Sequence, residues 1–478
     1  MYEHVTERLV DFALKVQFRD LPQEAVDKIK LMLLDSIGCA LGAYVTDRAK
    51  LALAFAEESG GNPQASIIGG HRTSYDHAAF VNGELITALD YDILGPIGGG
   101  HVAPFVTSPC LAMAEKAHVS GEEFLTALLL AHEMGGRFLS SLAGHRGPKD
   151  EPPYYEERLQ FSHGYSFFGG VIGACKLLGL DAGKTRHAFG IAGASAPVPA
   201  GQKWEFIDGP AIMTKFNAWC GWASELATVA TLLAEKGFTG DTTILDGERG
   251  FWRIVGSPTF NMDTLFGKLG EVWLEKLAFK RYPVCGHNRR GIEGIKSIMQ
   301  EHEIMPEEIE EIVVKADRFM LTPNRLMTQV KSFADMQYSN VNIFAVAAYY
   351  GDRPSPAWQT PIVYNDPRVK ALVQKIKVEV HPQSDEVVAE ALKAGKAIEV
   401  PDIVEIKAKG RTFVHQTTEA RKGTSANPMT KAELVDKFMI NASYSPIASD
   451  QSQEIVQTID ELEKLSDICQ LTRLLSIG

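Results

Sequence analysis

Apolar residues recur at three- and four-residue steps through most of the first 275 residues, which is the period of a helix with one buried face. The clearest case is LPQEAVDKIKLMLLDSIGCALGA, residues 21–43, in which Pro22 suits a first helical turn and Val26, Ile29 and Leu33 share one face. The same pattern is repeated in segments 121–142, 166–180 and 214–237. Several of these segments are apolar on more than one side, which predicts helices buried inside a large bundle.

After residue 300 the pattern changes to an alternation of apolar and polar residues with a period of two, which is typical of strands. In KIKVEVHP, residues 375–382, the side chains of Ile376, Val378 and Val380 would face one way and the charged residues the other. Segments 307–319 and 402–417 alternate in the same manner. These segments predict a half-solvated, antiparallel sheet, with helical patterns between its strands.

The helical pattern returns after GTSANPMT, so the chain is expected to rejoin its first domain. We therefore predict a mainly α fold, in which a smaller α+β lid domain is inserted into a large all-helical domain. The all-helical domain would comprise residues 1–275 and 425–478, and the lid residues 276–424. Two domains joined by two chain crossings form a natural cleft for a ligand.

The composition is that of a globular protein, with 45% hydrophobic and 23% charged residues among 478. A net charge of −12 argues against a nucleic-acid partner, although a local group of cations can still bind a small anion. The N-terminus lacks a basic leader, and no run of about 18 apolar residues occurs, so we expect neither a signal peptide nor a membrane-spanning helix. The six cysteines are scattered, which predicts buried free thiols in a reducing, cytoplasmic setting.

Three short motifs resemble known binding sites but fail on spacing. GLDAGKT, residues 179–185, is one residue short of a phosphate loop and follows a helical pattern, which indicates a turn between helices. GPIGGGH, residues 95–101, is glycine-rich without the dinucleotide-binding spacing. AHEMGGR lacks the second histidine of a zinc-protease helix. These segments therefore contain no metal-ligand spacing and no recognised phosphate- or dinucleotide-binding loop.

A scatter of polar residues in apolar or glycine-rich surroundings remains as candidate chemistry. Each has an ordinary structural interpretation, because isolated histidines are often hydrogen-bonded core residues and a single aspartate often caps a helix. Together they supply cations that hold carboxylates, imidazoles that carry protons and carboxylates that orient imidazoles. These are the parts needed to remove a proton α to a carboxylate and to stabilise the enediolate that forms. The residues are Asp90, Asp92, His101, His163, Lys215 and, within KRYPVCGHNRR, Lys280, Tyr282 and His287.

Several longer stretches, in their order and spacing, resemble the MmgE/PrpD family. They are LLDSIGCALGA, LDYD followed by HVAPFVTSPCLAMAE, SHGYSFFGGVIGACKLLGL, MTKFNAWCGWASELATVATLLAEKGFTG, LDGERGF, KRYPVCGHNRR and NPMTKAELVDKF. The family includes 2-methylcitrate dehydratase, cis-aconitate decarboxylase and iminodisuccinate epimerase. The resemblance implies a helical domain with an inserted α+β lid, a homodimer, an active site between the domains, and activity without metal or organic cofactor.

Matching the family motifs implies catalytic roles for Asp90, His101, His163 and Lys215. One histidine would be the base and the other the acid, with the aspartate orienting a histidine. A second list of residues is expected to contact substrate. It comprises Lys280, Tyr282, His287 and Asn342.

The chain departs from the family pattern at a few polar positions. Ile93 and Leu94 stand where an acid and a threonine are common, HVAP replaces an HPSD-type segment, and Asn342 stands where a tyrosine is usual. These changes remove polar contacts, which suits a less oxygenated substrate or a different proton path.

The favoured hypothesis is a cofactor-independent lyase or isomerase that acts on a small di- or tricarboxylate, as a hydro-lyase similar to 2-methylcitrate dehydratase. An epimerase or decarboxylase of a related polycarboxylate would use the same early steps. A non-catalytic carboxylate-binding protein is an alternative of another class. A cysteine nucleophile, Cys285 with His287, is a further alternative, although no third orienting group is evident.

Overall fold

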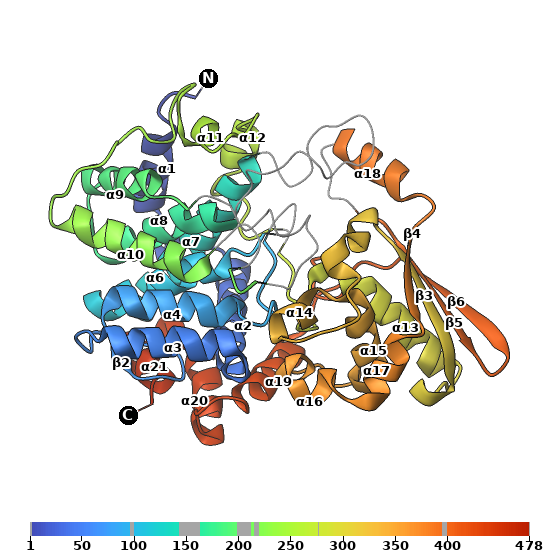
Figure 1. Ribbon diagram of the computed structural model, residues 1–478. Helices are drawn as coiled ribbons and strands as arrows, with labels where there is room; N and C mark the ends of the chain where they lie inside the picture. The colour runs from blue at the N-terminus through green and yellow to red at the C-terminus, as the bar shows by residue number, and fades with distance from the viewer. Residues whose placement is uncertain are drawn as a thin grey trace.

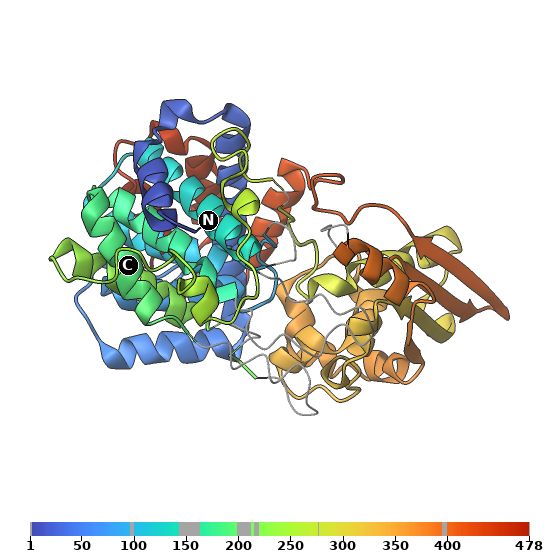
Figure 2. The same ribbon diagram turned by 90° about the horizontal axis from the view of Figure 1, so that it is seen from above.

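In the computed structural model, the described residues are 2–95, 100–142, 163–197, 212–214, 219–275, 277–393 and 399–477. Two hydrophobic cores lie side by side, one within a mass of helices and the other beside a small sheet (Figure 1). Seen from above, the two masses are joined along one boundary (Figure 2). Both chain ends lie on the helical mass.

The larger core consists of helices from the first half of the chain. Helix α2 (Gln23–Gly42) is buried along most of its length, as its continuous apolar pattern predicts, and it packs on α4 and α7. The ends of several helices are capped by side chains, as at Ser120 and Asp181, which start α7 and α9. The other helices are α1 (Val5–Lys15), α3 (Asp47–Ser59), α4 (Tyr75–Thr87), α6 (Ala103–Ala117), α7 (Gly121–Ser141), α8 (Phe167–Leu177), α9 (Ala182–Ala194), α10 (Cys220–Glu235), α11 (Phe251–Ile254) and α12 (Met262–Phe266). A small ribbon of β1 (Ala65–Ser66) and β2 (Arg72–Thr73) flanks them.

Helix α8 is inserted tightly between its neighbours because its first turns carry glycines. A Cβ added to Gly169 would lie 2.1 Å from the carbonyl oxygen of Ala131 on α7. One added to Gly170 would lie 2.4 Å from that of Phe105 on α6. Only glycine permits such close backbone approach, and this contact fixes the position of His163, which immediately precedes α8.

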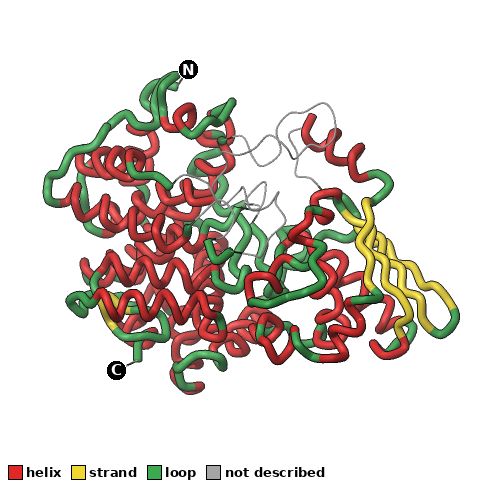
Figure 3. Tube along the Cα trace, viewed as in Figure 1, coloured by secondary structure: helices red, strands yellow, loops and turns green. Residues whose placement is uncertain are grey.

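The smaller core is formed by a four-stranded sheet and the helices on one of its faces. The strand order is β4-β3-β5-β6, and Val314 of β3 is paired with Val378 of β4 and Val404 of β5. Figure 3 shows these strands gathered on the side of the molecule away from the large core. The elements are α13 (Arg289–Glu301), β3 (Ile309–Ala316), α14 (Phe333–Tyr338), α15 (Asn340–Tyr350), α16 (Pro361–Tyr364), α17 (Pro367–Val373), β4 (Ile376–Val380), α18 (Ser384–Lys393), β5 (Asp402–Ala408) and β6 (Arg411–Thr417).

After the sheet the chain returns to the larger core through α19 (Lys431–Ala442), α20 (Ser449–Asp460) and α21 (Cys469–Leu475). Phe438 and Ile455 are buried within that core, and α19 packs along α2. The helical pattern predicted after GTSANPMT is thus confirmed.

The mainly α fold is confirmed, and the predicted strands form. The prediction of an antiparallel sheet is right for β3, β5 and β6 but wrong for β4, which runs parallel to β3. The helices between β3 and β4 carry the chain back across the sheet, and such a crossover allows a parallel pair. The predicted domain limits at residues 275 and 424 stay predictions.

Within the described residues no single helix has the length and apolarity to cross a membrane, although the bent pair of segments Gln23–Val45 and Asp47–Ser59 passes by length and composition alone. All six cysteines are buried free thiols.

Candidate active site

Three separate pieces of backbone meet at the boundary between the two cores. Leu94 forms bridges with both His101 and Ala278, and its main-chain bonds with Ala278 are 2.9 Å long in both directions. The amide of Gly95 also donates to the carbonyl of Gly100 at 2.5 Å. These contacts bring residues 94–101 next to a segment that lies more than 170 residues further along the sequence.

The segment after α4 is shaped by a left-handed residue. Asp90 has φ 52°, a conformation that aspartate tolerates better than most residues. Asp90 and Asp92 reach the same imidazole, while the Tyr91 hydroxyl donates to the Arg281 carbonyl at 2.9 Å.

His101 lies between the two carboxylates. Its Nδ1 is 2.8 Å from Asp92 Oδ2, and its Nε2 is 3.2 Å from Asp90 Oδ1. The histidine is only 5% exposed, and both aspartates are fully buried. A ring with carboxylates at both nitrogens donates from both, which is the hydrogen-bonding state of an imidazolium.

Lys280 completes a chain of alternating charges. Its ammonium group forms an ion pair with the Asp90 carboxylate and donates to the carbonyl oxygens of Asp90 at 2.7 Å and Val284 at 3.3 Å. Three acceptors match the three hydrogens of an ammonium group. In this conformation Lys280 therefore holds Asp90, and its predicted contact with a substrate carboxylate stays a prediction.

His163 is the fifth predicted residue in this group. It begins the short turn His163–Ser166, and its ring centroid lies 5.5 Å from that of His101. The His101 main-chain amide donates to His163 Nδ1 over a long 3.4 Å. In the neutral ring this bond favours the tautomer with its hydrogen on Nε2.

The electrostatics of the cluster favour a charged His101. Burial lowers the pKa of this imidazole and the Lys280 charge lowers it further, but the Asp92 charge and the hydrogen bonds to both aspartates outweigh them. The resulting pKa lies above the ordinary value for histidine. The surroundings therefore favour the protonated form of His101 more than water would.

The atoms of Asp90, Asp92 and His101 are close enough to hold a metal ion. However, the Lys280 ammonium already lies against the Asp90 carboxylate, so a divalent cation there would face a fixed positive charge. The arrangement fits an internal ion-pair network better than a metal site.

A second buried ion pair contacts the backbone segments that carry the first. Lys437 of α19 lies 2.6 Å from Asp35 of α2 and donates to the carbonyls of Tyr91 at 2.9 Å and Lys280 at 3.0 Å. Its ammonium also lies 3.7 Å from the centre of the Tyr91 ring. This pair ties two helices to both backbone segments that carry the cluster.

The other predicted residues have different surroundings. Tyr282 is stacked on Trp358 in the smaller core, and its hydroxyl donates to Glu293 at 2.7 Å. The ring of His287 packs against Phe319 at 4.9 Å.

Asn342 lies at the start of α15, where its amide donates to the carbonyls of Met327 and Thr328 at 3.3 and 3.2 Å. Lys215 lies outside the described residues. The catalytic role of Lys215, and substrate contact by Asn342, Tyr282 and His287, stay predictions.

The alternative nucleophile, Cys285, accepts a hydrogen bond from Arg325 Nη1 at 3.2 Å. Arg325 is 3% exposed and also packs over the Phe319 ring, 4.2 Å from its centre. Sequence inspection missed this buried arginine, because nothing in its local pattern distinguishes it from a surface residue.

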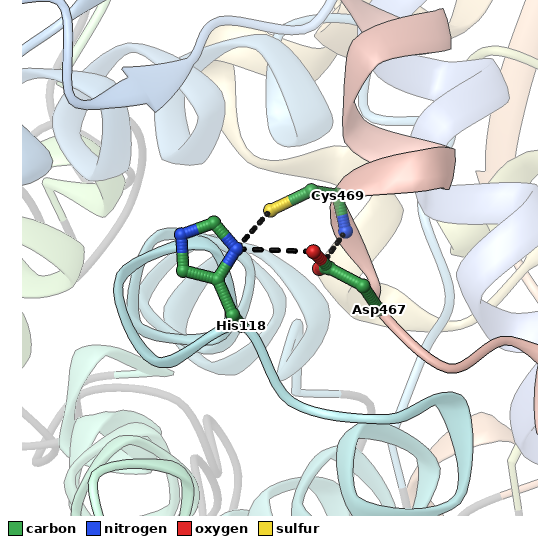
Figure 4. A group of neighbouring side chains, drawn as sticks. All are labelled: His118, Asp467 and Cys469. Carbon is green, nitrogen blue, oxygen red and sulfur yellow. Dashed lines mark hydrogen bonds and ion pairs between the residues drawn. The ribbon is translucent and has the colours of Figure 1, made fainter.

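A separate group of titratable side chains joins the end of α6 to the start of α21. His118 Nδ1 lies 3.1 Å from Asp467 Oδ2 and 3.4 Å from Cys469 Sγ (Figure 4). Because both partners meet the same ring nitrogen, the group differs from a nucleophile–base–acid triad, which needs partners on opposite nitrogens. By spacing these three residues could hold a metal ion, as could Asp76, His77 and Glu225.

Fold and site together define a class of protein: a mainly helical chain with a second core beside a sheet, and a buried histidine–carboxylate–lysine cluster where the two cores meet. Residues 7–262 match the MmgE/PrpD N-terminal domain and residues 282–462 the MmgE/PrpD C-terminal domain. The chain belongs to the MmgE/PrpD family, as the resemblance predicted.

Curated relatives align with nearly the whole chain. This chain is 25% identical to cis-aconitate decarboxylase of Mus musculus and 24% identical to that of Homo sapiens. These alignments cover 99% of this chain and 94% and 95% of the relatives. A cis-aconitate decarboxylase-like protein of Aspergillus oryzae, oryM, is 25% identical over 63% of the chain and 62% of its own length.

Proposed function

We propose that this protein is a cofactor-independent lyase that acts on a small di- or tricarboxylate by moving a proton at the carbon next to a carboxylate. The observation that carries the proposal is the buried alternation of Lys280, Asp90, His101 and Asp92, in which an imidazole lies between two acids. Such a group is suited to general acid–base catalysis, because its protonation is set by fixed neighbours rather than by water.

In the proposed mechanism His101 donates a proton from Nε2. The shorter bond, from Nδ1 to Asp92, orients the ring, and the longer bond to Asp90 is the one that a substrate would replace. This transfers to Asp92 the orienting role predicted for Asp90. Lys280 acts as a positioning residue, since it balances the Asp90 charge when the imidazole turns to the substrate.

One observation favours decarboxylation over the dehydration expected from the sequence: the relatives that align over nearly the whole chain are named cis-aconitate decarboxylases. In that reaction the bond to the departing carboxylate breaks, its electron pair returns to the carbon skeleton, and a proton from His101 is taken up there. Dehydration would need the same donor, which would protonate the departing hydroxide, together with a base for the α-proton. The inserted α+β region would act as a lid over this site.

The test is proton NMR in deuterated water with a panel of di- and tricarboxylates. Carbon dioxide release with deuterium at the adjacent carbon supports decarboxylation, loss of water supports dehydration, and deuterium exchange without net change supports epimerisation. His101→Asn should abolish turnover. The matched control is His132→Asn, which changes another buried histidine, one hydrogen-bonded to Thr107 at 3.3 Å.

Thermal stabilisation by a carboxylate, without exchange or turnover for any compound, would instead support the non-catalytic binding protein and reject the lyase. Full turnover in the His101 variant would reject the assigned proton donor.

A further inference from the structure

A cavity of about 260 Å³ lies on the other side of the segment that carries Lys280. It is bounded by the first turns of α13, the end of β6 and residues 419–427. Lys280 faces the buried cluster, while its neighbour Arg281 lines this cavity.

The charge around the cavity is unbalanced. Five lining side chains are cationic and two, Glu293 and Glu419, are anionic. The cations are Arg281, Arg289, Arg290, Arg421 and Lys422. An excess of arginines around one cavity is the arrangement that proteins use to hold oxyanions.

Two of these arginines are buried at an unfavourable place. Arg289 and Arg290 are 4% and 6% exposed and occupy the first turn of α13, where the helix dipole disfavours cations. Burial, with the charges of Arg421 and Arg290, lowers the pKa of Arg289 to about 9. An anion in the cavity would offset the dipole, the like-charge repulsion and the loss of hydration together.

Arg290 and Arg421 each have a buried N–H group that donates no hydrogen bond within the described part of the chain. Arg290 pairs with Glu399 and donates to the Val400 carbonyl at 2.6 Å, but its buried Nε has no hydrogen-bond partner among the residues that the structure describes. The same holds for Arg421 Nε, whose distance to Glu399 is 3.8 Å. Two unused N–H groups beside one cavity point to a missing acceptor.

Nearby acids neutralise the arginines only in part. Glu399 serves both Arg290 and Arg421 and is 50% exposed, so water screens it. Burial raises the pKa of Asp402 to about 7, so that this acid carries only part of its charge near neutral pH. It is 4% exposed.

From these observations we infer that the cavity is a binding site for a small oxyanion with two or more negative charges, of the phosphate or polycarboxylate class. The site is distinct from the proton-transfer cluster. Arg289 donates to the carbonyls of Phe279 and Lys422, one on each chain crossing between the two cores. A bound anion would fix this arginine and both crossings. The inference does not depend on the proposed reaction.

The two sites are nevertheless close. A Cβ placed on Gly286 would be 3.9 Å from both Arg289 Nη2 and Lys280 Cε. An experiment must therefore separate anion binding in the cavity from binding at the cluster.

Isothermal titration calorimetry of the full chain with inorganic phosphate, pyrophosphate and citrate, in a low-salt buffer, makes the separation. Arg421→Gln should weaken binding at least tenfold, and Arg281→Gln, at a more exposed lining residue, should weaken it in the same direction. Lys377→Gln, which removes one equal charge from the exposed strand β4, should change affinity less than twofold. His101→Asn should leave it unchanged.

Preference among the three probes distinguishes a phosphate from a polycarboxylate ligand. The inference is overturned if no probe binds the wild-type chain at millimolar concentration. It is equally overturned if His101→Asn abolishes binding while both arginine variants keep it, since the anion would then occupy the cluster. Loss of the proposed lyase activity with intact anion binding would reject only the reaction.

Discussion

Replacing Lys437 by methionine tests whether the second buried ion pair holds the candidate site together. Lys437 and Asp35 have side chains that are 4% and 0% exposed, so removal of the cation leaves a buried carboxylate whose remaining side-chain donor is the Cys39 thiol at 3.9 Å. Methionine keeps most of the length of the lysine stem and can still pack on the Tyr91 ring. The substitution therefore removes mainly charge and three hydrogen bonds, to Asp35, Tyr91 and Lys280.

Breaking one partner of a buried ion pair reduces the free energy of unfolding by about 3–5 kcal/mol. At roughly 2–4 °C per kcal/mol for a cooperative unit of 150–250 residues, the melting temperature should fall by roughly 6–20 °C. Burial already raises the pKa of Asp35 despite the opposing Lys437 charge, and removal of that charge raises it further. A carboxyl whose pKa is higher in the folded state destabilises progressively as pH rises, so the loss should be smaller at pH 5 than at pH 8.

Differential scanning calorimetry at a fixed scan rate measures these shifts. Lys431→Met is the matched control, because Lys431 lies on the same helix and pairs with Asp460 at an exposed position, where loss of the pair changes stability by at most about 1 kcal/mol. Asp35→Leu combined with Lys437→Met removes both charges and should recover most of the loss. Equal melting temperatures for the Lys437 and Lys431 variants would refute the assigned role of this pair.

Three further predictions concern the same boundary. Asp92→Asn removes the largest influence that raises the pKa of His101, so NMR titration should show a lower pKa for this imidazole. The alkaline limit of any activity that needs protonated His101 should then move to lower pH. Lys280→Met should change the His101 pKa in the opposite direction, since the Lys280 charge lowers it; an unchanged titration in both variants would contradict the network. Gly423→Ala should lower the melting temperature far more than Gly410→Ala, because both have positive φ but only the former would place a Cβ 1.9 Å from a main-chain oxygen.

Local features were predictable from the sequence, and long-range contacts were not. The apolar period of 3.6 identified α2, α7 and α8, and the period of two identified the strands, because burial of one face imposes both patterns. The direction of β4 could not be predicted, since alternation is the same in parallel and antiparallel strands when one face is solvated. Asp90 and Lys280 are 190 residues apart, and only family resemblance suggested that they share a site.

The buried ion pair of Lys437 and Asp35 was not predicted, for a related reason. Lys437 lies in a helix whose charged residues resemble those of any solvated face, and Asp35 interrupts an apolar helix with no visible partner. A buried aspartate in an otherwise apolar helix is a signal that a cation must come from elsewhere, because an isolated buried charge is too costly. Sequence alone cannot say which cation.

The charge balance of the cluster separates proton transfer from substrate binding. Lys280 and a protonated His101 are matched by Asp90 and Asp92, so the four groups carry no net charge. A di- or tricarboxylate cannot be attracted by a neutral group of charges alone; each carboxylate needs a further cation nearby. Arg325, buried beside Cys285, is one such cation among the described residues, and it is the arginine to test for substrate affinity. On this reasoning Arg325→Gln should raise KM with little change in kcat, whereas changes to His101 should lower kcat, and the same outcome for both residues would show that binding and proton transfer are not separate.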